Sequence, residues 1–216
     1  MVYYFQSTAT DPPTTIYMGK DKFENEELIK YGWTNDVWFH VDKLSSAHVY
    51  LRLQEGDRWD QIDEKLLLDI AQLTKANSIE GNKKDNICII YTPWSNLKKT
   101  GDMDTGQVGF HKNKTVKRTY IDTRRNEIIN RLNKTKTEDY PDLGLMKIQN
   151  EKMIRKQQRE LEKLQNQAEL EYIKEKQLEK KKGLNGYESL MVEEHMYSNK
   201  GLDMTKTAQE LEDDFM

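Results

Sequence analysis

The sequence is poor in cysteine and in long apolar runs, and each shortage excludes a class of protein. Cys88 is the single cysteine among 216 residues, which excludes an intramolecular disulfide and zinc sites built on paired thiolates. The most apolar run, ICIIY at 87–91, is far shorter than the roughly 20 residues of a membrane-spanning helix. The N-terminus MVYYFQSTAT has no signal-peptide pattern. We therefore expect a protein of the cytoplasm or the nucleus, with membrane association through a partner left open.

Charge is divided unevenly along the chain. The net charge is −3, with 33% charged and only 36% hydrophobic residues. Residues 1–82 hold 8 basic and 14 acidic side chains, residues 83–136 hold 13 and 5, and residues 137–216 hold 13 and 18. An acidic start, a basic middle and an acidic end indicate a localised site for a polyanion rather than a uniformly charged surface.

The stretch DVWFHVDKLSSAHVYLR at 36–52 predicts two paired strands with different faces. Because alternate residues of a strand point to the same side, one face is apolar and suits a protein core: Val37, Phe39, Val41, Val49, Leu51 and Leu53. The opposite face gathers polar and aromatic side chains, namely Asp36, Trp38, His40, His48, Tyr50 and Arg52. This second face could be a platform for a ligand or a second packed surface.

The rest of residues 1–136 predicts an α+β domain, a mixed sheet with packed helices. Strands are expected at 1–7, 14–19 and 86–92, a hairpin at 107–121 with its turn at 111–114, and a loop at 91–106. Helices are expected at 22–32, where Gly32 suits a C-cap, at 61–77 and at 124–136.

A different chemistry follows a predicted linker at 137–144. Residues 145–182 are dominated by Lys, Glu, Gln, Met and Leu and predict a long charged helix. Its heptad positions hold Gln157, Glu171 and Glu175 among the apolar residues, which makes a weak coiled coil. Residues 183–216 are predicted to be a flexible acidic tail.

Catalysis and metal binding find little support. Two histidines on neighbouring strands lack a recognisable third ligand. Gly101 and Gly106 have the spacing of a P-loop start, but Gln107-Val108 follows where Lys-Ser/Thr is required. We predict no catalytic residue, no metal and no cofactor.

Binding to single-stranded nucleic acid suits the residues better, because aromatic rings can stack on bases and a basic groove can meet phosphates. The candidate aromatic residues are Trp38, His40, Tyr50 and Trp94, with His48 beside them. The candidate cations are Lys20, Lys22, Arg52, Lys98, Lys99, Lys112, Lys114, Lys117 and Arg118. The alternative is that Trp38 and Tyr50 lie under a helix and that the lysines only solubilise the protein.

The same stretch resembles the signature of the NFACT-R family, in which Asp-x-Trp-Phe-His precedes Ser-x-His-Val. The later GQVGFHKNKTVKRTY is similar to the Gly-x-Val hairpin of that domain. The resemblance implies an RNA-binding module related to ribosome-associated quality-control factors.

Further segments, including IYMGKDKFENEELIKYGW and YTPWSNLKKTGDMD, resemble an animal branch of the family described as DNA-sensing membrane proteins. The branch implicates the region that Lys20, Asp21, Lys22, Phe23 and Glu24 occupy here. We therefore predict a non-enzymatic nucleic-acid-binding protein, with RNA in a ribosome or translation quality-control context favoured over DNA. The alternatives are a DNA sensor at a membrane and a scaffold that binds a ribosome or protein partner through the 145–182 helix.

Overall fold

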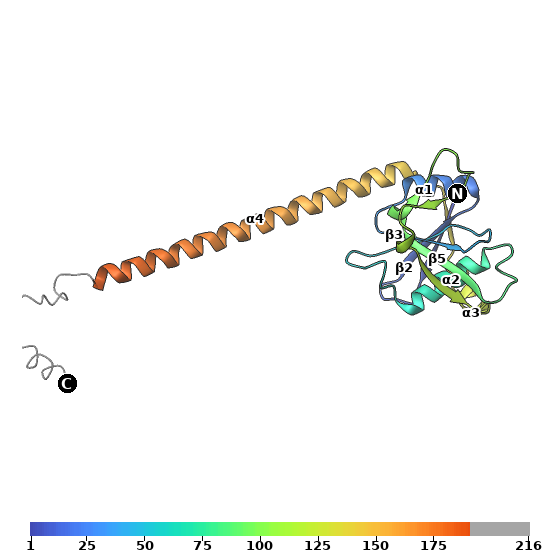
Figure 1. Cartoon of the computed structure of the whole chain (residues 1–216), viewed down its shortest axis with the longest axis horizontal. Helices are drawn as coiled ribbons and strands as arrows, with labels where there is room; N and C mark the ends of the chain where they lie inside the picture. The colour runs from blue at the N-terminus through green and yellow to red at the C-terminus, as the bar shows by residue number, and fades with distance from the viewer. Residues whose placement is uncertain (191–216) are drawn as a thin grey trace, which may run out of the picture. The chain divides into compact units, whose positions relative to one another are not determined.

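The computed structural model describes residues 1–190, with side chains described up to residue 182 (Figure 1). The chain divides into two units, residues 1–153 and residues 154–216, and each is described by itself. The acidic tail predicted at 183–216 lies, from residue 191 onward, outside the described residues.

The first unit is built on a sheet that has seven strands in the described part of the chain, in the order β8-β5-β3-β4-β2-β1-β9. Every neighbouring pair in it is antiparallel, so the α+β class is confirmed, although the sheet is not mixed. Its strands are β1 (Val2–Ser7), β2 (Thr14–Gly19), β3 (Asp36–Val41), β4 (Val49–Arg52), β5 (Ile87–Pro93), β8 (Lys117–Ile121) and β9 (Thr137–Asp139).

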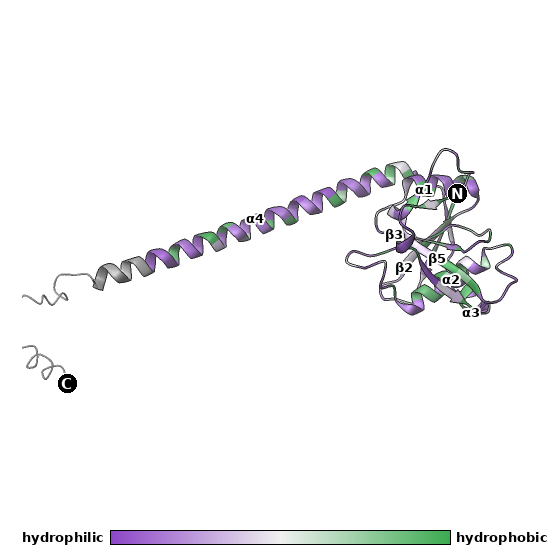
Figure 2. Cartoon of the chain, viewed as in Figure 1, coloured by the Kyte–Doolittle hydropathy of each residue, from purple (hydrophilic) through white to green (hydrophobic). Residues whose placement is uncertain are grey.

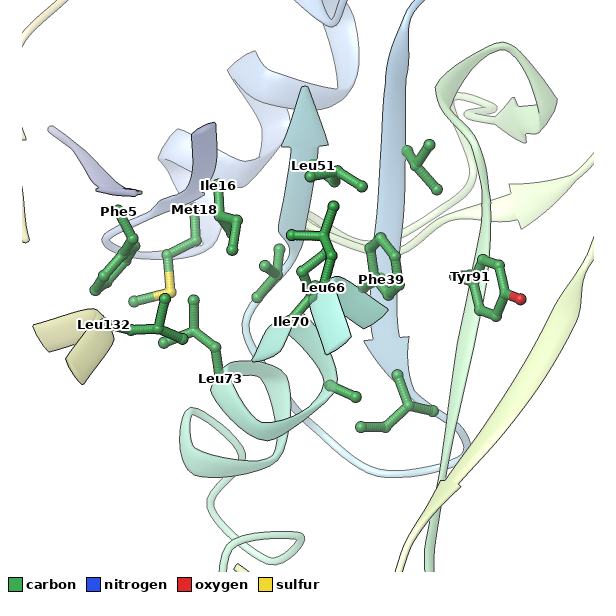
Figure 3. Close-up of a cluster of buried hydrophobic side chains, with 14 of the residues drawn as sticks. Phe5, Ile16, Met18, Phe39, Leu51, Leu66, Ile70, Leu73, Tyr91 and Leu132 are labelled. Atoms are coloured by element: carbon green, nitrogen blue, oxygen red, sulfur yellow. The ribbon is translucent and has the colours of Figure 1, made fainter. Parts of the chain in front are cut away.

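The main core lies between one sheet face and the helices α2 (Glu64–Ala76) and α3 (Asn126–Lys134). The register pairs Val37 with Leu51 and Phe39 with Val49, so the apolar face predicted for residues 36–52 points into this core. Figure 3 shows Phe39 and Leu51 beside Leu66 and Ile70 from α2, and Leu73 from the same helix beside Leu132 from α3. Burial of such side chains supplies the main stabilisation of the domain.

The opposite sheet face is buried as well. Trp38 and Tyr50 are 2% and 0% exposed and form a second core with Val2, Tyr17, Leu28 and Ile90. Leu28 comes from α1 (Lys22–Tyr31), and the residues packed around this core include Trp94, Leu97, Phe110 and Val116. The face predicted as a possible open platform is therefore a packed layer, because α1 and residues 94–116 cover it.

The hairpin predicted at 107–121 is wrong, because its two halves pair with different partners. β7 (Gly109–Phe110) pairs with β6 (Leu97–Lys98) in a small separate sheet. β8 instead pairs with β5 at the edge of the large sheet. Short helical turns at η1 (Trp94–Asn96) and η2 (Asn113–Thr115) let the chain change direction.

Residues 137–144 are not a simple linker. β9 adds an edge strand beside β1, with Tyr3 opposite Glu138. α4 (Leu143–Leu190) then begins two residues earlier than predicted and continues past Gly183 and Gly186.

Residues 154–182 of α4 carry mostly hydrophilic side chains, seen as the predominance of purple in Figure 2. Scattered apolar residues such as Leu161, Leu164 and Leu178 are more than half exposed. Among residues 1–190, no helix combines the length and apolarity that crossing a membrane requires.

The two ends of α1 are fixed by different means. Asp21 caps its first turn, since its side chain accepts hydrogen bonds from the backbone N–H groups of Phe23 and Glu24. Gly32 closes the helix as predicted, but with φ −56°, which is not a left-handed conformation. A Cβ at Gly32 would lie 2.2 Å from Nε1 of Trp94, so glycine is required here for close approach of the indole.

Candidate nucleic-acid interface

A cavity beside Trp94 is lined by two of the predicted site residues, Trp94 and Lys99. Its volume is about 420 Å³, and it is lined by Glu26, Ile29, Lys30, Trp94, Ser95, Leu97, Lys99 and His111. Ligand pockets in proteins commonly have volumes of about 300–1,000 Å³. The cavity is therefore large enough for a nucleobase.

The indole of Trp94 is held in one orientation by its neighbours. Its Nε1–H donates a hydrogen bond to the carbonyl oxygen of Ile29 at 2.8 Å. The Lys147 ammonium lies 4.5 Å from the ring centroid and donates to the carbonyl oxygen of Lys30 at 3.2 Å. Lys147 belongs to the start of α4, a segment that sequence reasoning had assigned to a separate helix. A lysine at that spacing gives no sequence signal for a contact with Trp94.

A second fixed element is the loop between β6 and β7. The Glu26 carboxylate accepts a hydrogen bond from the backbone N–H of Gly106 at 2.8 Å and pairs with Lys99 at 3.0 Å. Lys99 also donates to the carbonyl oxygens of Asp104 and Gln107, at 2.7 and 3.0 Å. Lys99, which was predicted to contact phosphate, lies in the cavity wall, but its ammonium is already used inside the protein.

Asn96 positions the basic turn next to Trp94. Its buried amide accepts from the backbone N–H of Lys112 at 2.8 Å and donates to the Lys112 carbonyl oxygen at 3.0 Å. The same amide donates to the hydroxyl of Thr92 on β5 at 2.9 Å. Residues 111–114 are therefore tied to the large sheet through one side chain that sequence reasoning missed. A polar residue in an apparent loop gave no indication that it would be buried.

Apart from Lys99, the predicted cations between residues 98 and 118 fall into two groups. Lys98, Lys112 and Lys114 are exposed and make no ion pair within residues 1–182. Lys117 instead donates to the carbonyl oxygen of Asp60 at 2.7 Å, and Arg118 is 3.9 Å from the Asp42 carboxylate. The first group is free to meet an anion, whereas the second has partners within the protein.

The predicted aromatic residues Trp38, His48 and Tyr50 are buried inside the domain. Trp38 stacks on the half-buried His40 at 5.3 Å and meets the edge of the buried His48 at the same distance. Burial, followed by the neighbouring His40 and Lys99, lowers the pKa of His48 to about 3. Burial likewise raises the pKa of Tyr50 well above its usual value. These rings cannot stack on a base without opening of the second core.

Arg52 also turns inward. Its guanidinium bonds the buried Asp36 carboxylate, with Nε 3.0 Å from Oδ1, and lies 3.5 Å from the ring centroid of Trp33. The hydroxyl of Tyr17 donates to the same carboxylate at 2.5 Å. This network stabilises a buried charge, which would otherwise be costly, and it leaves Arg52 little freedom to contact a phosphate.

The residues implicated by the DNA-sensing resemblance line a different cavity. Lys20, Asp21 and Lys22 contribute to a space of about 390 Å³ that shares no lining residue with the Trp94 cavity. Phe23 is 67% exposed nearby, while Glu24 is paired with the N-terminal amine. The side-chain oxygen of Asn25, which also lines this space, has no hydrogen-bond partner among the described residues.

A metal centre is absent from the described part of the chain, which contains no group of three or more His, Cys, Asp or Glu side chains that could hold an ion. His40 and His48 lie 5.1 Å apart between ring centroids, but no carboxylate completes a ligand set with them.

Comparison with known proteins agrees with the resemblance in the sequence. Residues 1–112 match the family described as NFACT protein RNA binding domain. The chain is 50% identical over 201 residues to coiled-coil domain-containing protein 25 of Mus musculus, covering 92% of this chain and 95% of the relative. The protein of that name from Danio rerio is 63% identical over 147 residues, covering 68% and 71%. A homologue from Dictyostelium discoideum is 52% identical over 143 residues, covering 66% and 68%.

Among solved structures, the C-terminal part of the fibronectin/fibrinogen-binding protein from Streptococcus suis is similar with a TM-score of 0.49 and 19% identity. That likeness covers 62% of this chain and 48% of the solved chain. The family match and the relatives together show that the chain belongs to the NFACT RNA-binding domain family, which confirms the predicted membership.

Proposed function

We propose that this protein binds unpaired RNA on the surface around the Trp94 cavity. The observation that carries the proposal is a cavity walled by an aromatic ring whose lining residues Lys99 and His111 stand close in the chain to three exposed lysines. These lysines are Lys98, Lys112 and Lys114, which have no ion-pair partner in the described chain. Lys98 precedes the lining residue Lys99, and the turn with Lys112 and Lys114 follows His111.

The chemistry of this surface favours a single strand over a duplex. An unpaired base exposes its π-face and can enter a cavity, while its neighbouring phosphates reach cations at the rim. A base inside a duplex cannot reach Trp94, because its faces are covered by stacked neighbours. The family assignment supports RNA as the nucleic acid, and we place the interaction in the cytoplasm, in a ribosomal or quality-control context.

The proposal is tested by the salt dependence of binding to a single-stranded RNA oligonucleotide. Three phosphate contacts at about −0.7 each give a log–log slope near −2. Reversing both charges in the Lys112→Glu/Lys114→Glu variant should flatten the slope by about 1.4 and weaken all sequences alike, since phosphate contacts carry no base information.

The matched control reverses two exposed lysines on the opposite side of the large sheet, in the Lys65→Glu/Lys134→Glu variant. Lys65 lies on α2 and Lys134 on α3, and both are exposed. This variant therefore changes the net charge by the same amount without altering the cavity. Binding by the folded Lys112/Lys114 variant with the affinity and slope of the parent would overturn the proposal. A scaffold role for the charged helix would then be favoured.

A second candidate, binding of DNA, is favoured by one observation. The cavity that contains Lys20 and Lys22 presents two exposed cations. If DNA binds there, reversing Lys20 and Lys22 to glutamate should weaken duplex DNA while leaving the affinity for single-stranded RNA unchanged. Equal losses of affinity for both nucleic acids would contradict the existence of two separate sites.

A further inference from the structure

The Trp94 cavity has one negatively charged side chain in a wall that is otherwise cationic, apolar or neutral. Among the lining residues, Glu26 carries the negative charge and Lys30 and Lys99 the positive charges. The Glu26 side chain is 34% exposed. A carboxylate next to a proposed site for a polyanion would weaken binding unless it recognises something other than phosphate.

The hydrogen bonds of this carboxylate leave it with spare capacity. Its Oε2 atom accepts from the N–H of Gly106 and pairs with the Lys99 ammonium. An ionised carboxylate offers about four lone-pair sites, so Glu26 can accept further hydrogen bonds. Lys99 cannot supply them, because its three N–H donors are directed at Glu26 and at the carbonyl oxygens of Asp104 and Gln107.

The other groups of the cavity define the rest of the ligand. The indole N–H of Trp94 is already donated to the Ile29 carbonyl oxygen, and the Lys147 ammonium lies 4.5 Å from the ring centroid. Trp94 therefore offers the part of its ring that lines the cavity rather than a hydrogen bond. Ile29 and Leu97 add apolar wall. A matching ligand is thus a flat ring with hydrogen-bond donors on the edge that faces Glu26.

We propose that Glu26 selects guanine, a step that rests on the proposed binding of unpaired RNA at this cavity. Guanine carries N1–H and the N2 amino group side by side, and both donors can be directed at the Oε1 atom of Glu26, because Oε2 already accepts from Gly106 and Lys99. Adenine and cytosine place a ring acceptor beside their amino group, and uracil places carbonyl oxygens on both sides of N3–H. Each of those edges therefore sets an acceptor against the negative charge of Glu26.

The test measures the affinity of the full chain for uridine decamers that carry a single central guanosine, inosine or uridine. Because paired hydrogen bonds to one base edge discriminate against the other bases, the guanosine oligonucleotide should bind about tenfold more tightly than the all-uridine one. Inosine lacks the N2 amino group and should fall between them. Equal affinities for the three oligonucleotides would overturn the inference even if every variant misfolded.

The Glu26→Gln variant should lose the guanosine preference, measured as the ratio of its affinities for the guanosine and all-uridine decamers, because an amide has one acceptor oxygen and no charge. Glu27→Gln is the matched control, since Glu27 is exposed on the same helix but does not line the cavity. The preference should persist in that variant, and its loss there would count against Glu26 as the reader.

The two proposals fail in different ways. If the all-uridine decamer binds with the expected salt slope but guanosine gives no advantage, guanine selection is wrong and RNA binding stands. If no oligonucleotide binds to the wild-type protein, the proposed function itself is wrong.

Discussion

Lowering the pH from 7 to 5 should destabilise this domain through His48. The imidazole is 4% exposed and its Nδ1 atom has no hydrogen-bond partner among the described residues. Burial, His40 and Lys99 lower its pKa from 6.5 to about 3. Below pH 6.5 the unfolded chain therefore binds a proton at His48 that the folded chain takes up only near pH 3. Stability is fully present above 6.5 and is lost as the pH falls toward 3.

The size of the effect follows from the same shift. From pH 6.5 to pH 5, a span of 1.5 pH units, protonation of His48 in the unfolded chain lowers the free energy of unfolding by about 1.36 kcal/mol per unit. The domain should thus lose about 2 kcal/mol of stability through His48 between pH 7 and pH 5. His40 adds in the same direction, because burial lowers its pKa as well.

Urea unfolding of the wild type, His48→Gln and His111→Gln at pH 7 and pH 5 measures this contribution. His48→Gln should lower stability at pH 7 but lose about 2 kcal/mol less than the wild type on acidification. His111 is exposed, so His111→Gln should behave as the wild type does. The same pH-dependent loss in the wild type and in His48→Gln would refute the account of His48.

Three further substitutions test other contacts. Phe39→Ala should cost about 3–5 kcal/mol in urea unfolding because Phe39 fills the main core, whereas His40→Ala should cost much less; equal losses would contradict this. Gly32→Ala should cost about 1–3 kcal/mol by overpacking against Trp94. Gly101→Ala should be near neutral, because its Cβ would meet nothing within 4 Å. Equal losses of stability in the two variants would refute the argument that Gly32 is needed for the close approach of Trp94. Asn96→Ala should cost about 1–3 kcal/mol by leaving the part-buried backbone N–H and carbonyl of Lys112 without their amide partner, and it should speed hydrogen exchange at Lys112. Unchanged exchange would argue against the tether.

The sheet could be predicted from the sequence where one face is strongly patterned. The alternation in residues 36–52 identified β3, β4 and the inward side of Phe39 and Val49, because a half-apolar strand must turn its apolar side to the core. It could not show what covers Trp38 and Tyr50. That cover comes from α1 and from residues 94–116, which are distant in the sequence, and a period of two carries no information about them.

The remaining differences have local causes. β9 was missed because Thr137, Glu138 and Asp139 are exposed and show no apolar alternation. The hairpin at 107–121 was predicted because pairing between neighbouring segments is the common case. Here β8 is held by β5 instead. In the candidate site, Trp94 and the lysines could be proposed from residue type, whereas Glu26, Asn96 and Lys147 could be found only from their contacts.

Crosslinking of RNA to the full-length protein tests the central proposal most directly. Single-stranded RNA that contains 4-thiouridine is irradiated with the protein, and the crosslinked peptides are mapped by mass spectrometry. We expect crosslinks in residues 94–114, with a loss of yield in the Lys112→Glu/Lys114→Glu variant and no loss in Lys65→Glu/Lys134→Glu. Crosslinks confined to the 145–182 helix, or equal yields from both variants, would contradict RNA binding at the Trp94 cavity.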